Sequence, residues 1–180
     1  MKLIKKIKDR EVKDDSGFRI RKASRAILFD DKKLVPIIYV SEFNYHKLPG
    51  GGIEEGESRE EALEREMYEE VGSEIKIMGE VGKSIEHRTE LNLKQISYCY
   101  FGQITKKGET HYTDKEIEEG FSLIWLPLDK AIFRLQTDKP ENYEGLFIQK
   151  RDLAFLLRTK DLIEKAEAEE KKEKTEDKKE

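Results

Sequence analysis

Three glutamates of this chain are spaced to act together in chemistry. Glu66, Glu69 and Glu70 stand at positions i, i+3 and i+4, so a helix would place their carboxylates within an arc of about 100° on one face. Consecutive glycines at 50–52 come shortly before them and allow the main chain to approach an ion closely. A hard divalent cation takes oxygen ligands of this kind. The spacing therefore predicts a metal platform on a helix that follows a glycine-rich turn.

The segment that carries these acids has the signals of an amphipathic helix. Ser58 and Glu61 form a capping-box pair at its start, and Gly72 provides its end. An apolar stripe at positions i, i+4 and i+8 consists of Leu63, Met67 and Val71. The centre of this stripe lies roughly 110° around the helix from the centre of the acidic cluster. We therefore expect one side of the helix to dock on a sheet while the acids face a cleft.

Strand patterns surround this helix. Residues 23–29 and 34–40 predict two strands joined by a turn, and Pro36 places the second strand at a sheet edge or a bulge. Residues 41–52 predict a loop. Later strands are expected at 74–85, 95–105 and 121–126, and later helices at 128–135 and 143–158. Strands around one central helix, with more helix at the end, predict a mixed α/β or α+β layered domain.

Composition divides the chain into three parts. Residues 1–17 are polar and lysine-rich and predict an N-terminal arm, for which a loose segment and a short extra strand fit equally well. Residues 18–158 have the composition of one domain with a real core. Residues 159–180 are almost all Lys, Glu, Asp and Ala, and predict a charged tail that either extends the last helix or is disordered.

Charge and cysteine content limit the expected surroundings and partners. With a net charge of −4, the chain has no global basic field for nucleic acid. Cys99 is the only cysteine, so no disulfide can form within the chain, which fits a reducing compartment. No apolar run has the length of a signal peptide or a membrane span. We therefore expect a cytoplasmic protein without membrane or nucleic-acid partners.

The acidic helix and the glycine turn together resemble a known family signature. The sequence reads Gly51, five residues, Glu57, seven residues, and then Arg65-Glu66-Met67-x-Glu69-Glu70-x-Gly72. This pattern is similar to the box of the MutT-like Nudix hydrolases, G-x5-E-x7-R-E-U-x-E-E-x-G-U, in which U is a bulky aliphatic residue. Ser73 departs from the last position, which concerns helix packing and not chemistry. The resemblance implies a mixed sheet sandwiched between helices, whereas the alternative is a plain Glu-rich, solvated helix.

The resemblance also implies roles for the residues of the box. The catalytic set would consist of Glu57, Arg65, Glu66, Glu69 and Glu70. Mg²⁺, or Mn²⁺, would be bound by the last three carboxylates and by the backbone carbonyl of Gly50. Glu57 would brace the junction between loop and helix, and Arg65 would orient the carboxylates through an ion pair with Glu69. The alternative for Arg65 is an ordinary surface pair at i,i+4.

Two kinds of site residue stay open at this level. The general base is either an acid of the box or one of the residues outside it, namely Glu86, His87, Glu90, Glu116, Glu118 and Glu119. Candidate substrate contacts are Arg25 on the first predicted strand and Tyr45 and His46 in the loop before the box. Arginine suits a phosphate, and an aromatic ring can stack on a base. The alternatives explain these residues at least equally well: Arg25 would be an ordinary surface charge, and Tyr45 and His46 would pack under the loop.

The reaction implied by the resemblance is the hydrolysis of a pyrophosphate bond with Mg²⁺. The predicted substrate is a nucleoside diphosphate linked to another moiety. We lean toward nucleoside triphosphates, oxidised ones included, that yield a monophosphate and pyrophosphate, while ADP-ribose, dinucleoside polyphosphates and nucleotide sugars stay open. Two rivals are a non-catalytic Nudix domain that senses a nucleotide and an interaction protein that uses its charged tail. A homodimer also stays open, because dimers are frequent among similar proteins.

Overall fold

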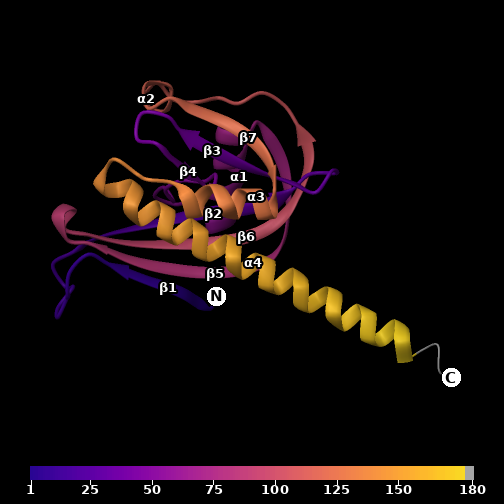
Figure 1. Ribbon diagram of the computed structural model, residues 1–180. Helices are drawn as coiled ribbons and strands as arrows, with labels where there is room; N and C mark the ends of the chain where they lie inside the picture. The colour runs from indigo at the N-terminus through magenta and orange to yellow at the C-terminus, as the bar shows by residue number, and fades with distance from the viewer. Residues whose placement is uncertain (177–180) are drawn as a thin grey trace.

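Two sheets and the helices that cover them make up residues 1–176, which this computed structural model describes, with side chains for residues 1–174 (Figure 1). The strands are β1 (Leu3–Lys8), β2 (Arg19–Phe29), β3 (Leu34–Val40), β4 (Tyr45–Lys47), β5 (Ser73–Arg88), β6 (Leu93–Lys107) and β7 (Phe121–Pro127). The helices are α1 (Arg59–Val71), α2 (Asp114–Glu118), α3 (Leu128–Thr137) and α4 (Tyr143–Glu176), with a 3₁₀ turn η1 at Thr89–Leu91. The predicted mixed α/β architecture is confirmed.

The larger sheet has the strand order β1-β5-β6-β2 and mixes parallel and antiparallel pairs. β2 and β6 run parallel in an uninterrupted register from Arg19↔Leu93 to Phe29↔Gln103, whereas β5 and β6 are antiparallel. β1 is parallel to β5. The first part of segment 1–17 is therefore a short extra strand and not a loose segment. β2 begins before the predicted residue 23 because its polar first residues pair through their backbone with β6.

The smaller sheet has the order β4-β3-β7 and contains a strand that was not predicted. β4 lies inside the predicted loop 41–52, and its three residues are too few to show an alternation of polar and apolar side chains. β4 pairs only with residues 38–40 of β3, whereas β7 pairs with all of β3. Pro36 therefore lies where β3 has a neighbouring strand on one side only, as an edge position requires.

Helix α1 begins and ends where its sequence signals predict. Ser58 is the N-cap and forms a complete capping box with Glu61, and Gly72 caps the C-terminus in the left-handed conformation, with φ 64°. A Cβ atom at Gly72 would lie 2.2 Å from the carbonyl oxygen of Glu109, so this turn requires glycine. The apolar stripe of α1 packs on β2 and β6, in a cluster of Leu63, Met67 and Val71 with Ala26, Leu28, Tyr98 and Tyr100.

Alternation along β2 makes this strand the border between two cores. Ala26 and Leu28 face α1, whereas Ile27 belongs to a second cluster with Val35 and Ile37 of β3. The helical side of that second cluster consists of Ala131, Ile132 and Leu135 of α3 and of Phe155 and Leu156 of α4. Helices therefore cover the strands from two sides, with α1 on one and α3 and α4 on the other.

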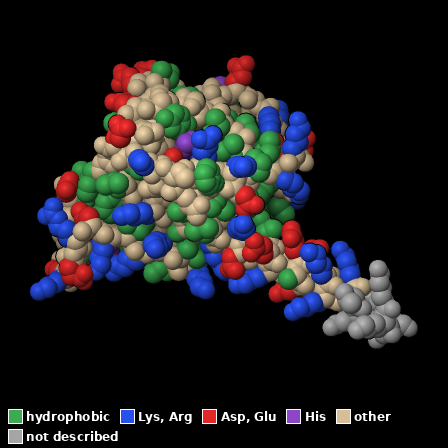
Figure 2. Space-filling view, in the orientation of Figure 1, with side chains coloured by type: hydrophobic (Ala, Val, Ile, Leu, Met, Phe, Trp, Pro, Cys, Tyr) green, Lys and Arg blue, Asp and Glu red, His purple; other side chains and the backbone are tan. Residues whose placement is uncertain are grey.

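The C-terminal helix is longer than the predicted 143–158. α4 continues to Glu176, so the described part of the tail 159–180 extends this helix, and residues 177–180 of the tail lie outside the described residues. Figure 1 shows α4 projecting from the body, and Figure 2 shows acidic and basic side chains along the projection. Ion pairs at i,i+4, such as Lys165–Asp161, run along it. Among the described residues, no helix is long and apolar enough to cross a bilayer.

Candidate active site

The glycine turn at 50–52 lies directly against β2 and the box helix. The amide of Ser24 donates to the carbonyl of Gly51 at 3.0 Å. A Cβ atom at Gly50, where φ is 124°, would lie 2.2 Å from the carbonyl oxygen of Ser24. At Gly51, a Cβ atom would lie 2.1 Å from Oε1 of Glu66. Glycine therefore allows the main chain to come this close to both the sheet and the carboxylates of α1.

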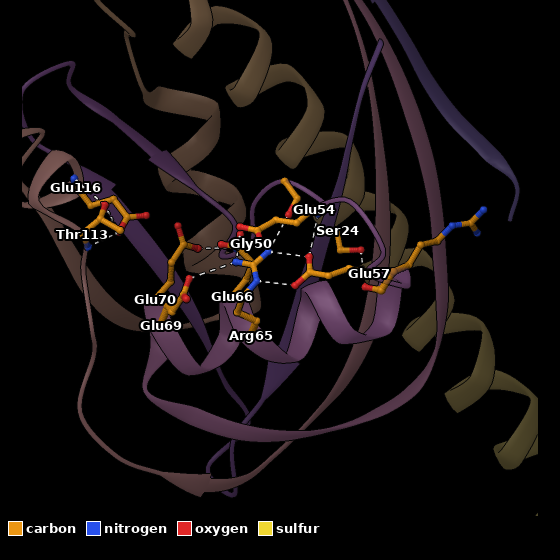
Figure 3. A network of polar contacts seen from close by, with 12 residues as sticks. Ser24, Gly50, Glu54, Glu57, Arg65, Glu66, Glu69, Glu70, Thr113 and Glu116 are labelled. Atoms are coloured by element: carbon orange, nitrogen blue, oxygen red, sulfur yellow. Dashed lines mark hydrogen bonds and ion pairs between the residues drawn. The ribbon is translucent and has the colours of Figure 1, made fainter.

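Arg65 is the centre of the polar contacts in the box (Figure 3). Its Nε and Nη2 donate to the two oxygens of Glu57 at 2.8 and 3.0 Å, and Nη2 also donates to the carbonyl of Gly52 at 3.0 Å. Its Nη1 donates to Glu66 at 2.9 Å and to Glu69 at 3.3 Å. One guanidinium therefore connects the glycine turn, the start of α1 and two of the three acids expected to bind metal. These contacts are the ones that Arg65 needs in order to orient the carboxylates of Glu66 and Glu69.

Glu57 is fixed from both sides of the junction between loop and helix. Besides its bonds from Arg65, its Oε2 accepts a hydrogen bond from the amide of Glu54 at 2.9 Å. The hydrogen bonds from Arg65 lower the pKa of Glu57 from 4.5 to about 2. A carboxylate with so low a pKa binds a proton too weakly to be a general base at neutral pH. Its contacts suit the bracing role instead.

Glu70 is the most deeply buried acid of the box, with 1% of its surface exposed. Its Oε2 accepts from the amide of Gly50 at 2.5 Å, and its Oε1 accepts from the ammonium of Lys47 at 2.7 Å. Burial raises the pKa of Glu70, and the neighbouring charge of Lys47 opposes that effect. These contacts hold the carboxylate at the junction between α1, β4 and the glycine turn.

The box acids offer a donor set that fits a hard divalent cation. Glu66, Glu69 and Glu70 supply oxygen atoms only, which Mg²⁺ and Mn²⁺ prefer. Within the described residues, no three His, Cys, Asp or Glu side chains converge into a metal cluster. Each of the three carboxylates instead binds a protein cation, since Lys47 contacts Glu70 and Arg65 contacts the other two. The site is therefore already built to hold positive charge.

A cleft of about 550 Å³ opens beside the box. Glu66, Glu70 and the turn 50–52 line one part of it, and Figure 3 shows Thr113 and Glu116 beyond Glu70 as seen from Arg65. Two of the three predicted substrate contacts line this cleft, namely Arg25 and Tyr45. The other basic side chains that line it are Arg19, Arg21, Lys47, Arg88, Lys115 and Arg151. The cleft is therefore locally rich in cations, although the chain as a whole is acidic.

His46, the third predicted substrate contact, does not reach this cleft. Tyr45 and Lys47 point to one face of β4, and His46 points to the other. The Nδ1 atom of His46 lies 2.8 Å from Oδ1 of Asp138, and its ring contacts that of Tyr39. These three residues line a separate hollow. The same alternation brings Lys47 into the cleft, a residue that the sequence analysis missed.

A buried ionic network behind the cleft was also not predicted. Arg151 of α4 donates to Asp152 and to Glu86 of β5, and Glu86 accepts two further bonds from Arg88. Asp152 also accepts a hydrogen bond from the amide of Leu48 at 2.9 Å. The network therefore ties α4 to the segment that leads into the glycine turn. Its members come from distant parts of the sequence, so no local pattern could have indicated them.

The structure separates the candidates for the general base. Glu116 and Glu119 line the cleft, although Glu116 also completes the capping box at the start of α2. Glu86 is fully buried between two arginines, and His87 lines a different hollow. Glu66 and Glu70 of the box, together with Glu116 and Glu119, are therefore the candidates that line the cleft.

Comparison with known proteins gives the family to which this architecture belongs. The family model of the NUDIX domain matches residues 19–147. The chain belongs to the Nudix family. Diphosphoinositol polyphosphate phosphohydrolase 2 of Rattus norvegicus is 29% identical over 136 residues, which cover 74% of this chain and 72% of the relative. RNA pyrophosphohydrolase of Helicobacter pylori (strain G27) is 40% identical over 58 residues, which cover 32% of this chain and 37% of that protein.

A solved structure shows that the fold is shared as well. The MutT Nudix hydrolase from Burkholderia pseudomallei superimposes with a TM-score of 0.52 at 18% identity, covering 74% of this chain and 98% of the other. Together with the family match, this confirms the predicted Nudix fold. The chain is a hydrolase that acts on pyrophosphate bonds of small phosphorylated substrates. Nudix enzymes typically depend on a divalent metal ion.

Proposed function

We propose that this Nudix enzyme is a Mg²⁺-dependent pyrophosphohydrolase that converts nucleoside triphosphates, oxidised ones included, to a monophosphate and pyrophosphate, and that Mn²⁺ can replace Mg²⁺. The observation that supports this proposal is a fixed set of carboxylates beside a cation-rich cleft. Glu70 is bound to Lys47 and to the amide of Gly50, and Glu66 and Glu69 are bound to Arg65. In this reaction the oxygen of water forms a bond to phosphorus, and the bridging P–O bond breaks.

Each residue of the site has a role in this proposal. The metal ligands are Glu66, Glu69, Glu70 and the carbonyl of Gly50. A bound ion would neutralise phosphate charge and lower the pKa of the attacking water. Arg65 and Glu57 keep the carboxylates aligned, while Arg25 and Tyr45 contact the substrate. The proton of the attacking water goes to a box acid or to a glutamate of the α2 segment.

A diphosphoinositol polyphosphate is a second candidate substrate. The name of the rat relative states this class, and the alignment covers most of both chains. The cations that line the cleft also favour a substrate with several phosphates. ADP-ribose, dinucleoside polyphosphates and nucleotide sugars are the remaining alternatives. A non-catalytic nucleotide sensor is disfavoured because every acid of the box is present.

The proposal extends to the organisation of the whole chain. Residues 18–158 would form the catalytic domain, residues 1–17 would add β1 to its sheet, and the tail 159–180 would be dispensable for chemistry. We infer a cytoplasmic enzyme that has a small nucleotide as its partner and binds neither membrane nor nucleic acid. A homodimer is the alternative to a monomer.

A substrate panel with matched glutamate variants tests the proposed function. The chain is incubated with each substrate class and Mg²⁺ or Mn²⁺, and phosphate is measured after a coupling enzyme. Glu69→Gln and Glu70→Gln should each lower kcat/KM on the best substrate by ~10²-fold or more, because they remove a ligand charge from the metal platform. Glu64→Gln is the control, because Glu64 is exposed on the same helix. A wild type that is inert on every class would refute the proposal.

A further inference from the structure

Arg25 is a buried cation without a hydrogen-bond partner for much of its guanidinium. It lines the cleft with only 5% of its surface exposed, and its Nε and Nη1 atoms have no partner among the described residues. Buried ionised groups are normally paired or fully hydrogen-bonded. Burial lowers the pKa of Arg25 to about 10, so the side chain is still charged at neutral pH. An anion from outside the protein would supply the missing partner.

Arg21 brings a second positive charge to the same side of β2. Because the register of β2 with β6 is uninterrupted, residues 21 and 25 project from one face of the strand. The Nη1 atom of Arg21 donates to the neutral side-chain oxygen of Gln95 at 3.2 Å. A Cβ atom at Gly52 would lie 3.2 Å from Nη2 of Arg21, and one at Gly50 would lie 3.0 Å from the Cα atom of Arg25. Both arginines therefore stand beside the glycine turn.

The two arginines contributed by β5 and α4 are already neutralised by carboxylates. Their ion pairs join Arg88 to Glu86 and Glu144, and Arg151 to Glu86 and Asp152. Arg21 and Arg25 form no ion pair with any described carboxylate. The acids that act electrostatically on Arg25 are Asp152 and Glu70, and these are bound by Arg151 and Lys47. The unused positive charge of the cleft therefore lies on β2.

This charge is additional to what the scissile pyrophosphate requires. In the proposed function, the pyrophosphate is held at the box, where a bound metal ion would offset its charge, and Lys47 is already paired with Glu70. The buried guanidinium of Arg25 then lacks an anionic partner, and the exposed guanidinium of Arg21 adds a second positive charge on the same face of β2. Phosphate matches them best, because its oxygens accept two parallel N–H bonds from one guanidinium.

We propose that Arg21 and Arg25 bind a non-scissile phosphate, so that the enzyme selects substrates with at least one phosphate beyond the two that share the scissile bond. The inference rests on the proposed function and divides its candidate substrates. Nucleoside triphosphates and diphosphoinositol polyphosphates carry such a phosphate. ADP-ribose and nucleotide sugars carry only the two phosphates of the bond that breaks, so they are poor substrates.

Paired substrates that differ in phosphate number test this selection. The wild type should have a higher kcat/KM for ATP than for ADP-ribose. Arg25→Gln and Arg21→Gln should each lose about 10- to 100-fold on ATP, mainly through KM, and less than about threefold on ADP-ribose. Lys22→Gln should behave as wild type, because Lys22 lies on the opposite face of β2 and lines another hollow. Equal losses on both substrates would overturn the proposal, as would a wild-type preference for ADP-ribose.

Binding without hydrolysis separates this proposal from the proposed function. Inorganic tripolyphosphate and inositol hexakisphosphate, which has no pyrophosphate bond, are titrated calorimetrically into the chain without divalent metal. Affinity for at least one probe should fall about tenfold or more in Arg25→Gln and stay unchanged in Lys22→Gln. A preference for tripolyphosphate supports a nucleotide source of the phosphate, and a preference for the inositol compound supports a polyphosphorylated ring.

The remaining outcomes of the titration are also decisive. Wild-type affinity for both probes in both arginine variants would overturn the subsite, whatever the enzyme hydrolyses. Arginine-dependent binding in a chain that hydrolyses nothing would refute the proposed function and leave the subsite standing. Thermal melting controls for folding, and Arg25→Gln should melt no lower than wild type because it removes an unpaired buried charge.

Discussion

A single guanidinium sets the geometry of the Nudix box in this chain. Arg65 uses Nε, Nη1 and Nη2 for five hydrogen bonds to Glu57, Gly52, Glu66 and Glu69. The rigid, planar fork of arginine can serve several acceptors in one plane, whereas a lysine ammonium is a compact point charge. The residues of the box therefore form one hydrogen-bonded network. Arg65 joins the bracing residue Glu57 on one side to the expected metal ligands Glu66 and Glu69 on the other.

The pH dependence of stability follows from the low pKa of Glu57. The pKa of Glu57 in the folded state is about 2, below the ordinary value of 4.5. The hydrogen bonds between Glu57 and Arg65 therefore stabilise the fold fully above pH 4.5, and this contribution is lost as the pH falls toward 2. Glu57→Gln should therefore lose less stability than wild type between pH 5 and about 2.5. Urea midpoints measured across this range check the expectation. Glu55→Gln, an exposed neighbour in the same loop, is the control, and a variant that follows the wild-type slope would contradict the assignment.

At the scale of secondary-structure elements, α1 could be predicted because all of its determinants are local. The capping box, the apolar stripe and the terminal glycine all lie within residues 58–72 and act through contacts a few positions apart. Even the departure at Ser73 is accommodated locally. This side chain is buried, and its hydroxyl donates to the carbonyl of Val71 at 3.2 Å. An aliphatic residue is therefore not needed to finish the helix at this position.

The rest of the site depends on partners that are distant in sequence. β4 exists because β3 offers it an edge, and its alternation then turns Lys47 toward Glu70 and His46 toward Asp138. The buried network joins Glu86 to Arg151, which are 65 positions apart. Such pairings follow from tertiary packing, which a single sequence does not display. The sequence therefore predicts the chemistry of the box and two residues of the cleft, Arg25 and Tyr45, but it does not indicate Lys47 or the buried network.

The end of α1 offers a test of this local control. Gly72→Ala should destabilise the fold by roughly 1–3 kcal/mol, because φ is positive there and the new Cβ would strike the backbone of Glu109. Urea unfolding measures the loss. Gly17→Ala is a matched control, because a Cβ atom at Gly17 would meet nothing within 4 Å. Equal stabilities of the two variants would show that the loop after β6 moves away from the new Cβ atom without a loss in the free energy of unfolding.

At the scale of the whole molecule, α4 connects the core, the cleft and the projecting tail. Phe155 and Leu156 are fully buried in the core that α4 shares with β2, β3 and α3. One turn earlier, Arg151 and Asp152 hold the segment before the glycine turn. From residue 164 onward, the described side chains are exposed. The helix thus changes from a structural part of the enzyme to a solvated rod along its length.

The effect of truncating α4 on stability and activity should therefore depend sharply on the residue at which the chain ends. A chain that ends at residue 164 should keep its melting temperature within ~2 °C of wild type and its kcat/KM unchanged, because every described side chain that it loses is exposed. A chain that ends at residue 154 loses Phe155 and Leu156, and each buried side chain of this size contributes about 2–5 kcal/mol. Since small domains are stable by only about 5–15 kcal/mol, the shorter chain should not fold cooperatively. Circular dichroism melts and the same substrate assay distinguish these cases. Loss of turnover in the chain that ends at residue 164 would assign the projecting helix a part in catalysis.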